Sequence, residues 1–323
     1  MLSSSIHVGG SILPGVSHRG HRDIRNASYK PILAIIAVAC VAALCVAYGY
    51  FIEPNRLIIN HDEIKIKGWD PAFDGIRIAM IGDIHGGSNN VTEEKLRLIV
   101  EKTNAENPDL IVLLGDYVSQ VRENKPISER GLKMPIETIA NNLSRFTAKY
   151  GVLVVLGNHD GWYSDTSVAA EFTRVGFRVL QDEVAVIEKN GKKLRFLGMF
   201  DHMKVKVWKD YSEAAKQAVL PTDKSGDLVV LQHSPDILHL VTGELSISDD
   251  LKLFLAAHHH GGQIWLPILG RPMIPSSYGQ KYANGHIKDR GLDMYVTSGI
   301  GTSVLPFRFM VPPEIMILTV RTE

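Results

Sequence analysis

The sequence predicts an α/β protein in which two mixed β-sheets pack together between flanking helices, preceded by one N-terminal transmembrane helix. Three observations support this prediction. Three short apolar runs each end in Gly-Asp or Gly-Asn and alternate with helical patterns, later apolar runs follow one another with few helices between them, and an uncharged apolar segment lies near the N-terminus.

The first half of the chain has the pattern of a parallel sheet. Residues 76–87, 109–118 and 151–160 each contain a buried apolar strand whose polar residues begin where the strand ends. Residues 93–106 have a helical pattern between the first two strands. Strands connected in this way run parallel, and active residues gather beyond their carboxyl ends. We therefore expect the Asp, His and Asn residues at these ends to form a site.

Further apolar runs predict a second sheet. Few helical patterns separate these runs, so we expect a mixed or antiparallel sheet that packs on the first. The polar run 119–136 predicts an exposed insertion. The predicted later strands lie at 178–188, 192–200, 227–233, 250–258, 294–300 and 314–320.

Residues 31–52 predict a membrane anchor. This uncharged run of 22 residues rises about 1.5 Å per residue as a helix and can cross a hydrocarbon core of ~30 Å. It is longer than the apolar region of a typical signal peptide, and Cys45-Val46-Ala47 matches a cleavage site poorly, so an anchor is favoured over a cleaved signal. The predicted domains are a basic tail (1–30), the transmembrane helix (31–52), a linker with a lead-in strand (53–74) and a catalytic domain (75–323).

Charge and cysteine content exclude several classes of protein. The 35 basic and 35 acidic residues balance, so no net positive field attracts nucleic acid, and nucleic-acid binding is not expected. Both cysteines, Cys40 and Cys45, lie in the apolar segment. The predicted catalytic domain therefore has no thiolate for catalysis, disulfides or zinc binding. The sequence does not determine the oligomeric state.

Five polar clusters follow predicted strands and predict a metal site. Their carboxylate, amide and imidazole groups form a ligand set without sulfur, which suits manganese, iron or zinc. In extended chain, residues i and i+2 face the same side, so each of two clusters can direct two ligands into one pocket. The clusters are Asp83-Ile84-His85, Gly115-Asp116, Gly157-Asn158-His159-Asp160, His233 and His258-His259-His260.

Each cluster alone has an ordinary structural explanation. A Gly-Asp pair such as the one at Asp116 is usually a turn or a helix cap, a single histidine such as His233 usually satisfies local hydrogen bonds, and three adjacent histidines can form a nonspecific surface patch. Unrelated turns would not place these residue types at the ends of successive buried strands. Their coincidence therefore favours a metal site.

The motifs GDIHG, GDYV, GNHD, LQHSPD and AHHHGGQIWLP resemble, in order, those of calcineurin-like metallophosphoesterases. The resemblance covers about residues 75–320. The segment SGIGTSVLPFRFMVPPEI is similar to the membrane-associated bacterial branch, which includes signal-bearing phosphoesterases and a lipid A pathway hydrolase. The family's sandwich of two mixed sheets agrees with the fold predicted above.

The resemblance implies a role for each site residue. Two divalent ions are expected, most readily Mn²⁺, with Asp116 bridging them. His159 corresponds to the catalytic histidine beside the substrate phosphate. His259 occupies a position where the family usually has threonine, which leaves the assignment of the outer histidines open. The expected ligands are Asp83, His85 and His260 for one ion and Asn158, His233 and His258 for the other.

Two residues beside these ligands are candidates for supporting roles. Asp160 directly follows His159 and could orient a site histidine, or it could be a solvated turn residue. Gln263 follows the last ligand and could contact substrate or simply pack.

Metal-dependent phosphoester hydrolysis is the predicted function. Two metals can share a hydroxide and clamp phosphoryl oxygens during in-line attack. A tether concentrates the enzyme at the bilayer, which favours a lipid or lipid-linked phosphate and a role in lipid metabolism. The first alternative is hydrolysis of UDP-2,3-diacylglucosamine in lipid A biosynthesis. The second is a non-catalytic metal-binding scaffold, because fold does not fix function.

The basic residues around the apolar segment predict its topology. Four precede it and three closely follow it, which places the N-terminus inside and the catalytic domain on the outer, periplasmic face. Protease added to spheroplasts should then digest the catalytic domain and leave a short membrane-bound stub, detected by immunoblotting. Protection until lysis would reverse the orientation, and a soluble product that starts near residue 48 would show a cleaved signal peptide.

Overall fold

The computed structural model describes residues 29–222, 226–243 and 246–323. The chain divides into two compact units, Met1–Ala43 and Leu44–Glu323. Helix α1 (Lys30–Ala47) begins in the first unit, and none of its residues is buried. Together with the turns up to Asn55, it is long and apolar enough to cross a membrane by length and composition. Residues 1–28 of the predicted basic tail (1–30) lie outside the described residues.

The first sheet of the second unit confirms the predicted parallel strands. The prediction that all later runs form the second sheet was wrong, because the start of the 178–188 run and the 314–320 run join the first sheet as β5 and β12. Strands β2, β3, β4 and β5 run parallel to one another, β12 runs antiparallel to β2, and β1 pairs in parallel with β12 at one edge. Helix α2 (Glu93–Ala105) connects β2 and β3, as predicted. In sheet order, the strands are β1 (Ile58–Ile66), β12 (Glu314–Thr322), β2 (Ile76–Ile81), β3 (Leu110–Leu114), β4 (Val152–Val155) and β5 (Arg178–Val179).

The second sheet is mixed. Four neighbouring strands run parallel, and the two edge strands β6 and β10 run antiparallel to them. In sheet order, the strands are β10 (Gly285–Asp289), β11 (Leu292–Val296), β9 (Leu251–Ala256), β8 (Gly226–Leu231), β7 (Lys192–Gly198) and β6 (Glu183–Lys189).

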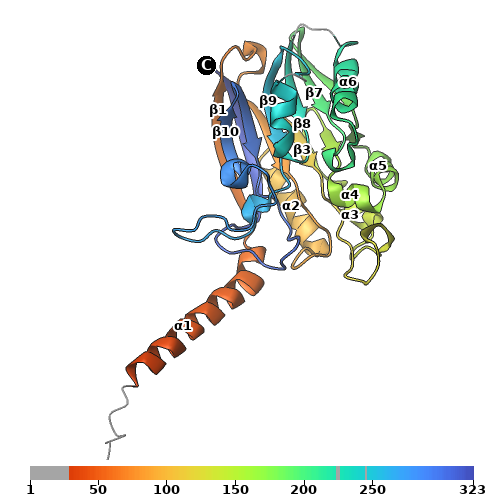
Figure 1. The fold of residues 1–323 in the computed structure, drawn as a ribbon. Helices are drawn as coiled ribbons and strands as arrows, with labels where there is room; N and C mark the ends of the chain where they lie inside the picture. The colour runs from red at the N-terminus through yellow and green to blue at the C-terminus, as the bar shows by residue number, and fades with distance from the viewer. Residues whose placement is uncertain (1–28, 223–225, 244–245) are drawn as a thin grey trace, which may run out of the picture. The chain divides into compact units, whose positions relative to one another are not determined.

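The two sheets pack face to face, and helices cover their outer faces (Figure 1). The apolar core between the sheets includes the fully buried Val112, Phe196 and Leu255, which come from both sheets. Burial of apolar surface on both faces explains why these strands read as nearly continuous apolar runs. The first sheet packs with α2, α3 (Ile136–Leu143) and α5 (Asp165–Arg174), and the second packs with α6 (Trp208–Val219) and α7 (Leu238–Thr242).

Helix α2 shows how local sequence fixes an element. Thr92 caps its first turn, because its side-chain oxygen accepts a hydrogen bond from the N–H of Lys95 at 3.3 Å. Glu93 and Glu94 place negative charge at the positive end of the helix dipole. The buried face carries Leu96, Ile99, Val100 and Thr103, the three- and four-residue spacing of an amphipathic helix.

The chain between α1 and β1 is fixed to the catalytic unit. Residues Tyr48–Ile52 form a π-helical turn, and the C=O of Gly49 accepts a hydrogen bond from the N–H of Arg308 at 3.0 Å. A Cβ on Gly49 would lie 2.9 Å from the C=O oxygen of Arg308, so the approach requires glycine. The ring of Tyr48 also packs edge-on against Phe309.

Candidate metal centre

All seven predicted metal ligands lie beyond the carboxyl ends of central strands in the two sheets. Strands β2, β3, β8 and β9 each end two residues before a predicted ligand, and β4 ends three residues before Asn158. The geometry follows from parallel pairing, because the carboxyl ends of neighbouring strands meet at one edge. The ligands are Asp83, His85, Asp116, Asn158, His233, His258 and His260.

One group of side chains combines Asp83, His85 and His260, whose nearest nitrogen and oxygen atoms lie within 4.8 Å of one another. The two Nε2 atoms of the histidines lie 3.2 Å apart, and Nε2 of His260 lies 3.7 Å from Oδ1 of Asp83. Oδ2 of Asp83 accepts the backbone N–H of His258 at 3.0 Å, whereas the buried Oδ1 has no hydrogen-bond partner. Such an orphaned oxygen fits a cation ligand.

A second group combines Asp116, His233 and His258. Nε2 of His233 lies 3.0 Å from Nδ1 of His258 and 3.3 Å from Oδ2 of Asp116. The same Oδ2 lies 3.6 Å from Nε2 of His85, so Asp116 stands between the two groups. The buried Oδ1 of Asn158 has no hydrogen-bond partner and adds an amide oxygen. Two neighbouring divalent ions therefore fit this set of donors.

Backbone carbonyls set the tautomers of two histidines. Nδ1 of His85 lies 3.2 Å from the C=O of Val118, and Nδ1 of His233 lies 2.8 Å from the C=O of Leu114. A carbonyl only accepts, so each Nδ1 carries a proton, and in the neutral ring Nε2 keeps a lone pair directed into the cluster. This is the orientation that a metal ligand requires.

Burial keeps most of the site histidines neutral. It lowers the pKa of His85 to about 3 and holds the pKa values of His258 and His260 well below the usual range. His233 differs. Burial alone would lower its pKa, but the carboxylates of Asp116 and Asp83 raise it to about 10. Burial also raises the pKa of Asp83 to about 7. The buried carboxylates therefore favour a positive charge among them, which a bound cation would supply in place of the His233 proton.

Five of the seven predicted ligands have a left-handed backbone. Positive φ is uncommon outside glycine, and each such residue costs on the order of 1 kcal/mol or more. Strain of this kind concentrates at functional sites. The φ values are 51° for Asp83, 47° for His85, 57° for Asp116, 73° for His258 and 51° for His260.

Asp160 holds backbone N–H groups in place. The sequence had suggested either that it orients a site histidine or that it is a solvated turn residue. Its two carboxylate oxygens accept four N–H groups, from Asp116 at 2.8 Å, Tyr117 at 2.9 Å, Val118 at 3.2 Å and Gly157 at 2.9 Å. Asp160 thereby holds the loop after β3 against the loop after β4.

His159 faces the cavity from helix α4 (Asn158–Tyr163). Its Nδ1 lies 2.8 Å from Oε1 of Gln120, whose amide nitrogen donates to the C=O of His159 at 2.8 Å. These bonds place a proton on Nδ1 and leave Nε2 toward Ser303, 3.5 Å away. Gln120 is buried although it lies in the run predicted as an exposed insertion, so that prediction was wrong at this position.

The middle histidine of the triple points away from the two groups. Nδ1 of His259 bonds the C=O of Tyr282 at 2.9 Å, and its Nε2 lies 3.5 Å from Oδ1 of Asp236. The outer residues His258 and His260 are the ones that join the cluster. The positions of His258 and His260 agree with their assignment as ligands, which His259 in the usual threonine position had left open.

Gln263 shapes the cavity by holding a loop. Its amide nitrogen donates to the C=O groups of Leu305 and Phe307 at 2.9 and 3.1 Å, and its oxygen accepts the N–H of Ser303 at 2.7 Å. It also lines the cavity, so its position allows both roles suggested by the sequence, contact with substrate and packing.

Sequence reasoning missed two further residues near the cluster. The fully buried guanidinium of Arg308 donates to the C=O groups of Ser298, Gly301 and Val311, and thus fixes the loop behind His260. His202 follows β7 and lines the cavity. His202 follows a single buried aspartate and belongs to no motif. Arg308 stands in the segment SGIGTSVLPFRFMVPPEI, but the resemblance carried by that segment assigned it no role.

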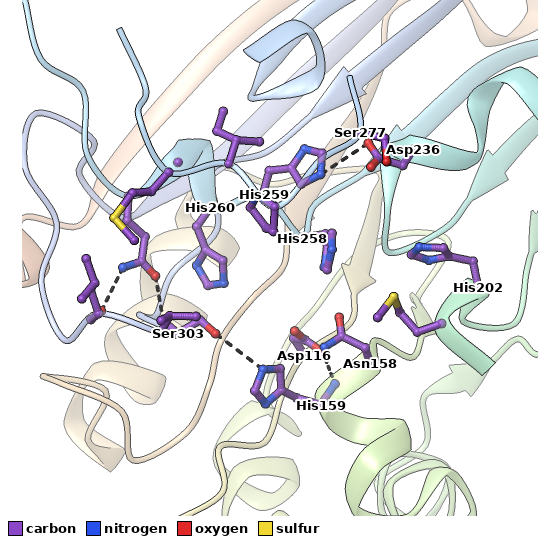
Figure 2. A pocket seen from close by; sticks show the side chains of 18 of the residues that line it. Asp116, Asn158, His159, His202, Asp236, His258, His259, His260, Ser277 and Ser303 are labelled. Carbon is purple, nitrogen blue, oxygen red and sulfur yellow. Dashed lines mark hydrogen bonds and ion pairs between the residues drawn. The ribbon is translucent and has the colours of Figure 1, made fainter. Parts of the chain in front are cut away.

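The cluster lies at the base of a cavity of about 720 Å³. Figure 2 shows His159 and Ser303 on one side of it and His202 and Asp236 on the other. Above the polar base, much of the wall is apolar. The apolar wall residues are Trp162, Met203, Pro272, Met273, Ile274, Pro275, Val304 and Leu305.

Comparisons with known proteins find relatives that are named metallophosphoesterases or phosphodiesterases. The chain is 29% identical over 292 residues to the uncharacterized metallophosphoesterase YkuE of Bacillus subtilis, which covers 90% of this chain and 94% of YkuE. It is 26% identical to the phosphodiesterase YaeI of Escherichia coli, over 87% of this chain and 96% of YaeI. It is 25% identical to a zebrafish transmembrane protein with a metallophosphoesterase domain, over 93% of this chain and 64% of that protein.

Residues 76–263 match the calcineurin-like phosphoesterase family, and this match covers more than half of the chain. The matched region contains all seven predicted ligands and His159. Together with the sandwich of two sheets and the Asp/His clusters at its edge, the match identifies the chain as a phosphoester hydrolase that belongs to the calcineurin-like phosphoesterase family.

Proposed function

We propose that this protein hydrolyses a lipid or lipid-linked phosphoester at a membrane surface, with two divalent metal ions held by the buried cluster. The observation that carries this proposal is the convergence of two ligand groups on Asp116 at the base of a largely apolar cavity. The polar base suits a phosphoryl group, and the apolar wall suits an acyl or isoprenoid chain.

The residues present divide naturally between two ions. Asp83, His85 and His260 would hold one ion, Asn158, His233 and His258 would hold the other, and Asp116 would contact both. Bound at this site, the ions would neutralise phosphoryl charge and lower the pKa of water. Oxygen and imidazole ligands without sulfur suit Mn²⁺, with iron and zinc as alternatives.

His159 is the proposed catalytic histidine. Gln120 holds its Nδ1 proton, so Nε2 is the atom that faces a substrate in the cavity. Protonated there, it could donate to a phosphoryl oxygen or to the leaving-group oxygen. Burial lowers the pKa of His159 and so favours the neutral ring in the free protein; a phosphate anion bound beside it would favour the protonated ring that donates.

Residues 31–52 are the proposed membrane anchor. In water, an unburied helix carrying Ile32, Leu33, Ile35 and Val41 on its surface would expose a large apolar area, whereas a bilayer would cover it. The zebrafish relative is named as a transmembrane protein. We place the catalytic domain (75–323) on the outer face from the charge bias.

The bridging role of Asp116 gives a direct test. Asp116→Asn should lose most of both metals and lower kcat by about 10²-fold or more, because the amide cannot bind two cations as a carboxylate does. Metal analysis by mass spectrometry and turnover of a chromogenic phosphodiester measure both. Asp249→Asn makes the same change on an exposed residue just before β9 and should alter neither. Full metal content with full activity in Asp116→Asn would refute the bridge.

Removal of His159 should separate catalysis from metal binding. His159→Ala should keep two metals per chain while kcat falls by about 10²-fold or more, because the variant loses only the proton donor. His61→Ala, an exposed histidine that pairs with Glu106, is the matched control and should leave kcat unchanged. Loss of metal in His159→Ala would instead make His159 a ligand, as its proximity to His85 and Asp116 would permit.

The substrate is tested with the full chain in lipid nanodiscs. Hydrolysis should require Mn²⁺, disappear with a chelator and return when Mn²⁺ is restored. We expect faster turnover of phospholipids or lipid-linked phosphates than of soluble esters. Turnover of soluble esters alone would remove the lipid part of the proposal. Selective cleavage of UDP-2,3-diacylglucosamine would favour the lipid A alternative, and inactivity on every substrate with both metals bound would favour a scaffold.

A further inference from the structure

We propose that a second membrane-contacting surface surrounds the catalytic cavity, so that the cavity opens directly onto the lipid bilayer. This surface, which we call the apolar rim, consists of exposed side chains from three segments of the second unit. The inference rests on the membrane anchor proposed above. The rim residues are Phe51, Ile52, Ile268, Leu269, Val304 and Met310.

The rim exposes large apolar side chains that water disfavours. Ile268 is fully exposed, Val304 is 73% exposed, Phe51 67% and Leu269 66%. Single exposed apolar residues are common on proteins, but a group from adjoining segments marks an interaction surface.

Backbone hydrogen bonds join the three segments into one layer. The N–H of Arg308 donates to the C=O of Gly49 at 3.0 Å and links the chain after α1 to the 302–311 loop. The N–H of Trp265 donates to the C=O of Phe309 at 2.9 Å, and that of Phe309 donates to the C=O of Gln263 at 2.8 Å. The 302–311 loop therefore lies between the end of the anchor and the 264–275 segment. Figure 1 shows both loops, in light and dark blue, leaving the same end of the sandwich.

The tip of the 264–275 segment is built around an exposed isoleucine. Leu266 and Gly270 exchange two backbone hydrogen bonds of 2.7 and 2.8 Å and close a tight hairpin. Ile268 at its tip has φ 76°, and Met310 in the neighbouring loop has φ 57°. Glycine or asparagine would relieve this strain, and a β-branched residue at positive φ is a clear outlier. An apolar side chain is thus present despite the backbone strain, which points to a role for the side chain itself.

The composition of the rim favours lipid as its partner. Residues 264–275 contain one charged residue, Arg271, and residues 302–311 contain one, Arg308, which is buried. A surface with so little exposed charge suits hydrocarbon better than a charged protein partner. Phe51 and Ile52 end the same apolar run that forms the anchor, so the rim continues the surface that a bilayer would already cover. Trp265, partly exposed beside the hairpin, suits the headgroup region.

Two of the three segments, 264–275 and 302–311, also line the cavity, which connects the rim to substrate choice. Val304 belongs to both, and Met273, Ile274 and Leu305 continue the apolar wall toward the polar base. A lipid phosphoester could pass from the bilayer along this wall while its phosphoryl group reaches Asp116 and His159. The rim thus extends the proposed function to a substrate taken from the membrane without entering water.

Fluorescence measurements on the full chain in nanodiscs test whether the apolar rim contacts lipid. In a Cys40→Ser, Cys45→Ser background, an environment-sensitive fluorophore on Ile268→Cys should shift to the blue and be quenched by lipids with spin-labelled acyl chains. The same label on Glu188→Cys, exposed on β6, should show neither effect. A label on native Cys40 in a Cys45→Ser chain reports on the anchor itself.

The outcomes separate the rim from the anchor. A quenched Cys40 label with an unquenched Ile268→Cys label overturns the rim and leaves the anchor intact. An unquenched Cys40 label overturns both. Discs that hold one copy of the chain exclude self-association. Quenching that persists in these discs supports lipid contact. A blue shift that requires two copies shows that the rim binds a second chain, and it overturns the proposal.

Activity provides an independent test. The double variant Ile268→Asn, Leu269→Ser should hydrolyse phospholipid in nanodiscs about tenfold more slowly or worse, because two apolar side chains no longer insert. Its turnover of soluble bis(p-nitrophenyl) phosphate should be unchanged, since neither residue lines the cavity and asparagine accepts positive φ. Equal rates on the phospholipid would overturn the rim. If the unaltered protein hydrolyses neither substrate, the proposed function fails, and the fluorescence measurement still decides the contact.

Discussion

The carboxylate of Asp160 holds together the two loops from which the centre of the site projects. It accepts N–H groups from the loop after β3 and from Gly157 before α4, and all of these groups are buried. Without it, several buried donors would lack partners, at about 1–3 kcal/mol each. Its position fixes Asp116 on one loop and Asn158 and His159 on the other. The N–H of His159 in turn donates to Oδ1 of Asp116 and leaves Oδ2 toward the histidines.

Other side chains in the site also use one atom to bond the backbone and direct another atom into the cluster. Asp83 and Asp116 each use one oxygen to hold a backbone N–H and present the other to the cluster. His85 and His233 each use one nitrogen on a backbone carbonyl and present the other. A side chain anchored at one atom and free at the next is oriented before any ligand binds. This preorganisation lowers the conformational entropy lost on binding.

Local patterns in the sequence predicted the parallel strands and placed the candidate ligands at their ends. The runs before Asp83, Asp116 and Asn158 are apolar because both faces of their strands are buried, and the change to polar residues marks where each strand ends. Since parallel strands end at one edge, the residue types at those ends predicted the cluster without knowledge of the full topology. The helical pattern at 93–106 likewise agrees with α2 (Glu93–Ala105).

Features that depend on distant parts of the chain could not be predicted in this way. Strand β1 pairs with β12, more than 250 residues away, and no local pattern specifies that partner. Gln120 looks like any polar loop residue until His159 lies beside it, and Arg308 gains its role only because Gly49, Gly301 and His260 surround it. Their roles arise from tertiary contacts, so the printed sequence contains no local sign of them.

The left-handed backbone at five predicted ligands implies that activity and stability oppose each other in this protein. At His258 and the other four positions, glycine or asparagine would relax the backbone. Selection for thermostability in a metal-free preparation would therefore favour replacements that destroy the site. In metal-replete medium the preference should invert, since every ion bound only by the native state adds to its stability by mass action.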